Sequence, residues 1–140
     1  MGLHLDAYLN TVAVVDVFRT QPKNIIAATI SLAYLKTPYK YGGNAAIEGL
    51  DCSGFVCEVL RSVGTISKND DYTAQGLYSI CDRNKNTLET GSLCFFGTSE
   101  ADIRHVGIHL GGGFMIEAGG GDSQTHMLSD AIQRNAYIRI

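Results

Sequence analysis

The chain has 140 residues, a length that suits one compact domain able to bury its own core. Apolar residues make up 45% and charged residues 18%, proportions that exclude a disordered chain. A net charge of −3 with scattered Lys and Arg residues gives no sign of nucleic-acid binding, and no apolar run approaches the roughly 18 residues of a membrane span.

We predict one domain over residues 1–140, with residues 1–20 as a helical extension at its N-terminus. Within 4–19, apolar residues recur at spacings of three and four, as in an amphipathic helix. These residues are Leu5, Leu9, Val12, Val15 and Phe18. Residues 1–10 lack the basic stretch and apolar run of a Sec signal, so we expect synthesis in the cytoplasm and, for action elsewhere, another means of delivery.

Three further helices are predicted, over about residues 23–36, 52–63 and 71–81. The first begins near Pro22 and ends before Pro38. Its periodic residues are Ile25, Ile26, Thr29, Leu32, Ala33 and Leu35. Gly64 fits the end of the second helix, and the Asp70-Asp71 pair fits the start of the third, where carboxylates stabilise the helix dipole.

The second half of the chain carries the short apolar stretches that predict β-strands. The expected strands cover residues 93–96, 105–110, 114–118 and 136–140. Gly111 to Gly113 form the turn between the second and third strands, because glycine readily adopts positive φ. The predicted fold class is α+β, an antiparallel sheet with helices packed on one side.

One of the four cysteines has unusual neighbours, and none of the four has the spacing of a CxxC pair or a zinc finger. The cysteines with apolar neighbours are expected to be buried free thiols: Cys57, Cys81 and Cys94. Cys52 instead lies between Asp51 and Ser53 at the start of a predicted helix. Free backbone N–H groups and the positive end of the helix dipole favour a thiolate there, and Gly54 lets a substrate approach those groups.

His105 is the candidate base for Cys52. A turn at residues 111–113 places Gly107 opposite Glu117, and side chains alternate between the two faces of a strand. Glu117 is then diagonal to His105 on one face and within reach of it. We expect Glu117 to hold one ring nitrogen while the other faces Cys52, which gives a nucleophile, a base and an orienting residue. Gly107 would leave room for substrate or for the Cys52 helix.

Other interpretations of these residues stay open at this point. Cys52, His105 and Glu117, with or without His109, are ligand types that bind zinc, and metal analysis would test such a site. A peptidase fold retained for a structural role would show little turnover and no labelling of Cys52 at neutral pH. Acyl transfer to a lipid uses the same Cys–His chemistry, although the sequence shows no apolar groove for it.

At these residues the chain resembles the NlpC/P60 family of papain-like cysteine peptidases. The matching segments, in order, are Pro38 to Gly43, Asp51 to Phe55, Gly91 to Phe96, His105 to Ile108 and Phe114 to Ala118. Together they cover about residues 25–118 and form a more specific pattern than the cysteine motif alone. The chain departs from the pattern at Glu117, where the family often has His, Asn or Gln, and also at Ser92 and His109.

The resemblance implies helices packed on an antiparallel sheet, and hydrolysis of an amide in peptidoglycan stem peptides, commonly between γ-linked D-Glu and the diamino acid. It assigns Cys52 as nucleophile, His105 as base and then acid for the leaving amine, and Glu117 as the third residue. It needs no metal or cofactor. The residues that would contact substrate are Tyr39, Asp51 and Ser53.

The setting in which such a domain acts is a further expectation. A peptidase-like domain with neither a Sec signal nor a wall-binding module would suit a phage endolysin, a phage tail or similar injection device, or an injected effector. Its partners would then be the peptidoglycan stem peptide and virion proteins. The alternative is a structural component of a tail assembly with little or no turnover.

Overall fold

The computed structural model describes residues 11–15, 23–40, 42, 44–45, 49–81, 89–119 and 137–139. Within them, the helices are α2 (Lys23–Leu32), α3 (Cys52–Ser62) and α4 (Ala74–Ile80). The strands are β1 (Thr11–Val15), β2 (Asn44–Ala45), β3 (Gly49–Leu50), β4 (Leu93–Ser99), β5 (Asp102–Gly111), β6 (Phe114–Gly119) and β7 (Tyr137–Arg139). None of the helices in these ranges is long and apolar enough to cross a membrane.

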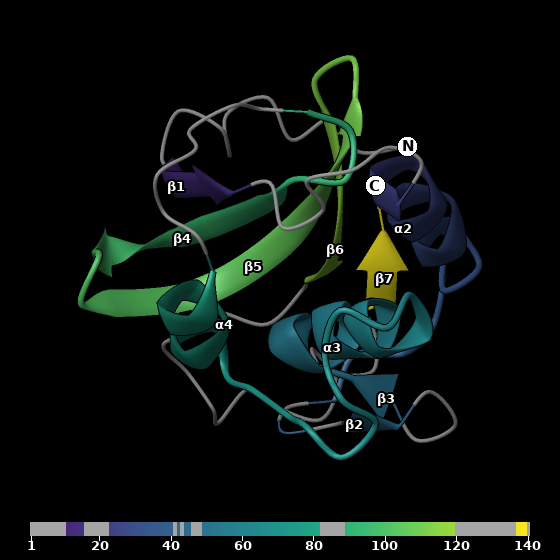
Figure 1. The fold of residues 1–140 in the computed structure, drawn as a ribbon, viewed down its shortest axis with the longest axis horizontal. Coiled ribbons are helices and arrows are strands. Elements are labelled where there is room, and N and C mark those ends of the chain that lie inside the picture. Colours follow the sequence, from purple (N-terminus) through teal and green to yellow (C-terminus); the bar gives the residue numbers. More distant parts are fainter. Residues whose placement is uncertain are drawn as a thin grey trace.

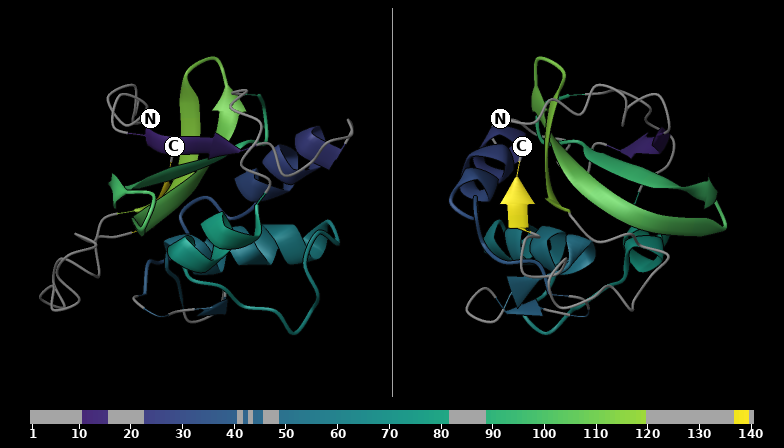
Figure 2. Two further views of the ribbon diagram at one scale, coloured as in Figure 1. Left: turned by 60° about the vertical axis from the view of Figure 1, so that its left-hand side comes forward. Right: turned by 180° about the vertical axis from the view of Figure 1, so that it is seen from behind.

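The described strands other than β2 and β3 form one sheet in the order β1-β4-β5-β6-β7, and each neighbouring pair is antiparallel. Helices α3 and α4 pack against β5, and α2 packs beside α3 at the periphery of the molecule (Figures 1 and 2). The predicted α+β class is therefore confirmed. Strands β2 and β3 pair with each other in the segment before α3.

The helix predicted over residues 4–19 is wrong for Thr11–Val15, which form the edge strand β1. Backbone pairing joins Val14 to Cys94 and Val15 to Leu93 of β4. Apart from Ala13, the segment consists of Thr and Val, whose branched side chains favour a pleated strand over a helix. The free edge of β4 supplies the hydrogen-bond partners, which apolar spacing alone does not reveal. The rest of the predicted helix lies outside the described residues.

Helix α3 supplies the centre of the core, and its predicted span is confirmed. Its inward face buries Phe55, Val56 and Val59 completely. These side chains belong to the same buried cluster as the strand residues Leu93, Phe95, Val106, Ile108 and Ile116. Gly64 ends the helix with φ +77°, a conformation that glycine adopts without strain. Burial of this face holds α3 against the sheet.

The other two helices differ from their predicted form. Helix α4 begins at the N-cap Thr73, whose Oγ1 accepts a hydrogen bond from the Gly76 N–H, rather than at the Asp70-Asp71 pair. Helix α2 ends at Leu32 and continues as turns to Lys36, which has φ +70°. The large apolar residues that predicted this helix face outward. The buried positions of α2 are Asn24, Ala27, Ala28 and Ser31.

Candidate active site

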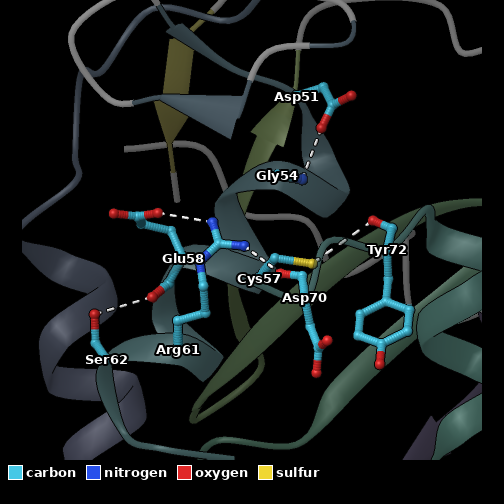
Figure 3. Close-up of polar contacts among 8 residues, drawn as sticks. All are labelled: Asp51, Gly54, Cys57, Glu58, Arg61, Ser62, Asp70 and Tyr72. Carbon is cyan, nitrogen blue, oxygen red and sulfur yellow. Dashed lines mark hydrogen bonds and ion pairs between the residues drawn. The ribbon is translucent and has the colours of Figure 1, made fainter. Parts of the chain in front are cut away.

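Cys52 is the first residue of α3, and its side chain is partly buried. Asp51 caps the helix: its Oδ1 accepts a hydrogen bond from the Gly54 N–H at 2.7 Å (Figure 3). The thiol is directed to β5, where its Sγ lies 3.9 Å from the carbonyl oxygen of Arg104. Cys52 therefore stands at the positive end of a helix, facing the strand that carries His105.

His105 lies on β5 opposite Phe96 of β4, and the two rings are in contact, with centroids 5.7 Å apart. Its Nε2 lies 2.6 Å from Oε2 of Glu117 on β6. Because Glu117 occupies Nε2, Nδ1 is the nitrogen left for Cys52. Burial alone would lower the pKa of His105, but hydrogen bonds and charge interactions with Cys52 and Glu117 outweigh it and raise the pKa to about 10.

The β5–β6 hairpin has the register that the sequence predicted. Ile108 pairs with Ile116 and His109 with Met115, the same alignment that places residue 107 opposite 117. The expected meeting of the His105 and Glu117 side chains follows from it. A glycine is needed at position 107 for a different reason from the one predicted. A Cβ there would lie 2.6 Å from the sulfur of Met115. The space beside Gly107 is filled by β6, not by substrate or α3.

Asp51 contacts three groups of its own chain. Besides the Gly54 N–H, its Oδ1 accepts from the Ser53 hydroxyl at 3.3 Å, and its Oδ2 accepts from the Gly42 N–H at 3.1 Å. Burial raises the pKa of Asp51, and these hydrogen bonds oppose the rise. The carboxylate therefore joins the segment at residue 42 to the start of α3. This tether to Gly42 was not predicted, since the motif alone does not show which backbone lies beside it.

Tyr39 reaches the site through backbone pairing. It forms a parallel bridge with Leu50, and the Leu50 N–H donates to the Pro38 carbonyl at 2.9 Å. Leu50 lies two residues before Cys52 and is fully buried, so this pairing holds the Tyr39 segment beside the start of α3. Both Tyr39 and Cys52 pack against the central core cluster. Tyr41 and Gly43, also in the predicted motif, lie outside the described residues.

The side chain of His109 lies away from Cys52 and contacts the segment before β4. Its ring Nδ1 lies 2.9 Å from the Glu89 carbonyl oxygen, and its backbone pairs with Gly91 and Ser92. Four residues along a strand separate it from His105 by roughly 13 Å, too far to share one metal ion with that ring. Across the described part of the chain, no three His, Cys, Asp or Glu side chains are grouped to hold a metal. The geometry thus gives no support to the zinc interpretation.

The remaining cysteines are free and buried, as predicted. Burial raises the pKa of Cys57 to about 11, with the Tyr72 carbonyl 3.6 Å from its Sγ (Figure 3). Burial also raises the pKa of Cys81 and of Cys94 to about 12. These thiols stay protonated at neutral pH. Cys52 differs from them in its position, because it is partly exposed and lies beside His105.

Comparison with known proteins identifies the family. The model of the NlpC/P60 family matches residues 36–140. This chain belongs to the NlpC/P60 family. A solved NlpC/P60 family protein from Bacillus cereus has the same fold, with a TM-score of 0.60 and 19% identity over 86% of this chain and 35% of that chain.

Two curated relatives come from Bacillus subtilis (strain 168). The chain is 29% identical to the probable peptidoglycan endopeptidase LytE over 76% of its own length and 30% of that protein. It is 33% identical to a gamma-D-glutamyl-L-lysine dipeptidyl-peptidase over 61% of its own length and 28% of that protein. The chain thus spans less than a third of the length of these two relatives.

Proposed function

We propose that this NlpC/P60 domain is a cysteine hydrolase that cleaves an amide bond in peptidoglycan stem peptides. Cys52 is the nucleophile, His105 the base and Glu117 the orienting residue. The observation that carries the proposal is the 2.6 Å hydrogen bond that Glu117 makes with Nε2 of His105. His105 lies on β5, the strand that faces the start of the Cys52 helix. It fixes the ring so that Nδ1 can exchange a proton with the thiol.

The reaction begins from a charged pair. The raised pKa of His105 keeps the ring protonated at neutral pH, and the imidazolium stabilises a thiolate at Cys52. The thiolate attacks the amide carbon, and the oxyanion binds the N–H groups of Cys52 and Ser53, because the Asp51 cap already occupies that of Gly54. His105 then protonates the leaving amine as the C–N bond breaks, which leaves a thioester.

Hydrolysis of the thioester returns the enzyme to its first state. Neutral His105 removes a proton from a water molecule, whose oxygen attacks the thioester carbon. The C–S bond breaks, the acid product leaves, and the proton on His105 restores the imidazolium beside the thiolate. Glu117 stabilises the imidazolium in both half-reactions, since its carboxylate stays within hydrogen-bond distance of Nε2.

For the substrate, the support comes from the relatives. One is named a probable peptidoglycan endopeptidase and another a gamma-D-glutamyl-L-lysine dipeptidyl-peptidase. We propose the amide between γ-linked D-Glu and the diamino acid as the bond cleaved. Tyr39 stays the proposed substrate contact, and Ser53 offers its backbone N–H. Asp51 we assign as a positioning residue, because the cap and the tether already engage both of its oxygens.

The experiment measures new amino groups released from purified peptidoglycan and from muropeptides of defined sequence. The wild-type protein is expected to release them, and Cys52→Ala to abolish the release. The matched control is Cys81→Ala, which removes a buried thiol at the end of α4 and is expected to keep activity. No release by the wild-type protein from any wall type, or full release by Cys52→Ala, would contradict the proposal.

Delivery by a phage tail, an endolysin or another injection device stays a prediction. Mass spectrometry of purified particles from the source organism tests it, and absence of the chain from them would remove the virion setting. The structural role with little turnover is separated by thiol labelling: rapid reaction of Cys52 with an electrophile at neutral pH contradicts an inert site.

A further inference from the structure

Helix α2 is inverted relative to an ordinary surface helix. The side chains that it turns inward are small or polar: Asn24, Ala27, Ala28 and Ser31. The large apolar side chains lie on the opposite face and in the following turn, and they are exposed: Ile25 (48%), Ile26 (43%), Leu32 (41%) and Leu35 (39%). An amphipathic helix of a globular domain normally places such residues inward, so the outward face needs an explanation.

Close packing explains the small residues on the inner face but not the large ones outside. A Cβ added to Gly91 would lie 2.5 Å from the carbonyl oxygen of Asn24, so the backbone of α2 approaches the segment before β4 very closely. Beyond the helix, the Tyr34 ring packs edge-on against Phe55 of the core, with centroids 5.8 Å apart. These contacts hold α2 in place without its isoleucines and leucines.

The charge around this face is one-sided. Residues 23–40 contain three lysines and no carboxylate, in a chain whose net charge is −3. Lys23 and Lys36 are exposed at the two ends of the apolar stretch, and Lys40 is exposed further along. On α3, the charge of Glu58 adds to burial in raising the pKa of Tyr34. Glu58 forms an ion pair with Arg61 at 2.9 Å (Figure 3). The face therefore combines aliphatic side chains with positive charge.

This combination favours one occupant over two others. A second copy of the chain would bring lysines of 23–40 against lysines, which repel each other. The centres of protein interfaces are rich in aromatic residues, Met and Arg and poor in Lys, whereas this face presents Ile, Leu and Lys. Aliphatic residues flanked by lysines are typical of helices that lie in the headgroup region of anionic membranes. We propose that the outer face of α2 and the turn to Lys36 dock on an anionic lipid surface.

In this arrangement α2 lies parallel to the membrane plane. Its 10 residues span roughly 15 Å, enough to place Ile25, Ile26 and Leu32 among the lipid headgroups and acyl chain ends. Lys23 and Lys36 then meet lipid phosphates. The inner face of the helix stays on the protein, so the fold does not have to change. Docking does not require the thiol chemistry of Cys52.

The test is co-sedimentation of the full chain with vesicles of equal phosphatidylglycerol and phosphatidylcholine, and with pure phosphatidylcholine vesicles. We expect binding to the anionic vesicles alone, weakened as NaCl rises from about 0.1 M to about 0.5 M. Ile25→Glu and Leu32→Glu are each expected to weaken it about tenfold or more, by placing a charge in the apolar contact. The matched control is Ile80→Glu, at an apolar residue 51% exposed on α4, which should bind like wild type.

Several outcomes would overturn the proposal. They are absence of binding to anionic vesicles, equal binding to both vesicle types, or equal loss in Ile80→Glu and Ile25→Glu. Failure of vesicle binding would instead favour an acidic protein surface as the occupant of this face. A concentration-dependent dimer in sedimentation velocity that Ile25→Glu dissociates would favour a second copy. Cys52→Ala should bind as wild type does, so a failed vesicle experiment is distinguishable from failure of the proposed hydrolase activity.

Discussion

Helices α3 and α2 pack against each other, yet they turn different kinds of side chain toward the core. α3 buries Phe55 and Val59 and holds Cys52 at its first turn, facing the sheet. α2 turns alanines and polar side chains inward and leaves Ile25 and Leu32 exposed. The comparison shows that side-chain burial fixes the helix of the candidate site, whereas close backbone approach holds α2. The same fold can therefore combine a packed candidate site with an apolar outer surface.

The largest expected difference between the two helices is in activity. His105→Ala should lower kcat/KM for a defined muropeptide by about 10³-fold or more, because the thiol loses its base and the leaving amine its acid. Ile25→Glu should leave kcat/KM for the same soluble substrate unchanged. Steady-state kinetics with both variants checks this. A comparable loss in Ile25→Glu would show that α2 belongs to the site.

Stability should separate the two helices next. Phe55→Ala removes a fully buried ring from α3 and should lower the free energy of unfolding by about 3–5 kcal/mol. Ile25→Ala on α2 should change it by no more than about 1 kcal/mol, because about half of the side chain is already exposed to water. Urea unfolding of both variants gives the numbers. Similar losses would mean that the outer face of α2 is covered within the folded chain.

Glu117→Gln tests how the sheet orients and charges His105. Loss of the carboxylate should lower kcat/KM about 10- to 100-fold and lower the pKa of His105, so that the alkaline limb of the activity profile moves to lower pH. The raised pKa of His105 also contributes stability, in full below its ordinary value of 6.5 and lost as the pH rises through about 10. The variant should lose part of that contribution. An unchanged pH profile would remove Glu117 from the mechanism.

The smallest expected effect concerns the cap of α3. Asp51→Ala should lower the free energy of unfolding by about 0.5–2 kcal/mol, because the Gly54 N–H loses its acceptor. Asp51→Asn keeps a side-chain oxygen for that hydrogen bond and should restore most of the stability. Thermal unfolding of the pair measures the difference. If both variants keep full stability while substrate affinity falls, Asp51 contacts substrate rather than positioning the helix.

Local patterns were enough to predict the parts that form the candidate site. The apolar face of residues 52–63 determines how α3 packs, and the glycine turn with strand alternation determines which side chains share a face. The second of these brings His105 next to Glu117 on the hairpin. Such features depend on neighbours in sequence or directly across a hairpin, so the sequence contains them.

The parts that could not be predicted depend on distant neighbours. Thr11–Val15 become a strand because β4 offers a free edge some 80 residues away. The inverted burial of α2 depends on the close approach at Gly91, and Gly107 is required by Met115 of β6. Apolar spacing shows that α2 is amphipathic but not which side faces the core. Each of these features needed the tertiary arrangement.

Alkylation of the wild-type protein and of His105→Ala at neutral pH is the sharpest test of a Cys52 thiolate paired with the His105 imidazolium. Brief treatment with iodoacetamide, followed by peptide mass mapping, gives the rate at each cysteine. We expect modification of Cys52 alone at neutral pH, and much slower modification of Cys52 in His105→Ala. A rate at Cys52 that His105→Ala does not lower, or equal labelling of the buried cysteines, would contradict a thiolate held by His105.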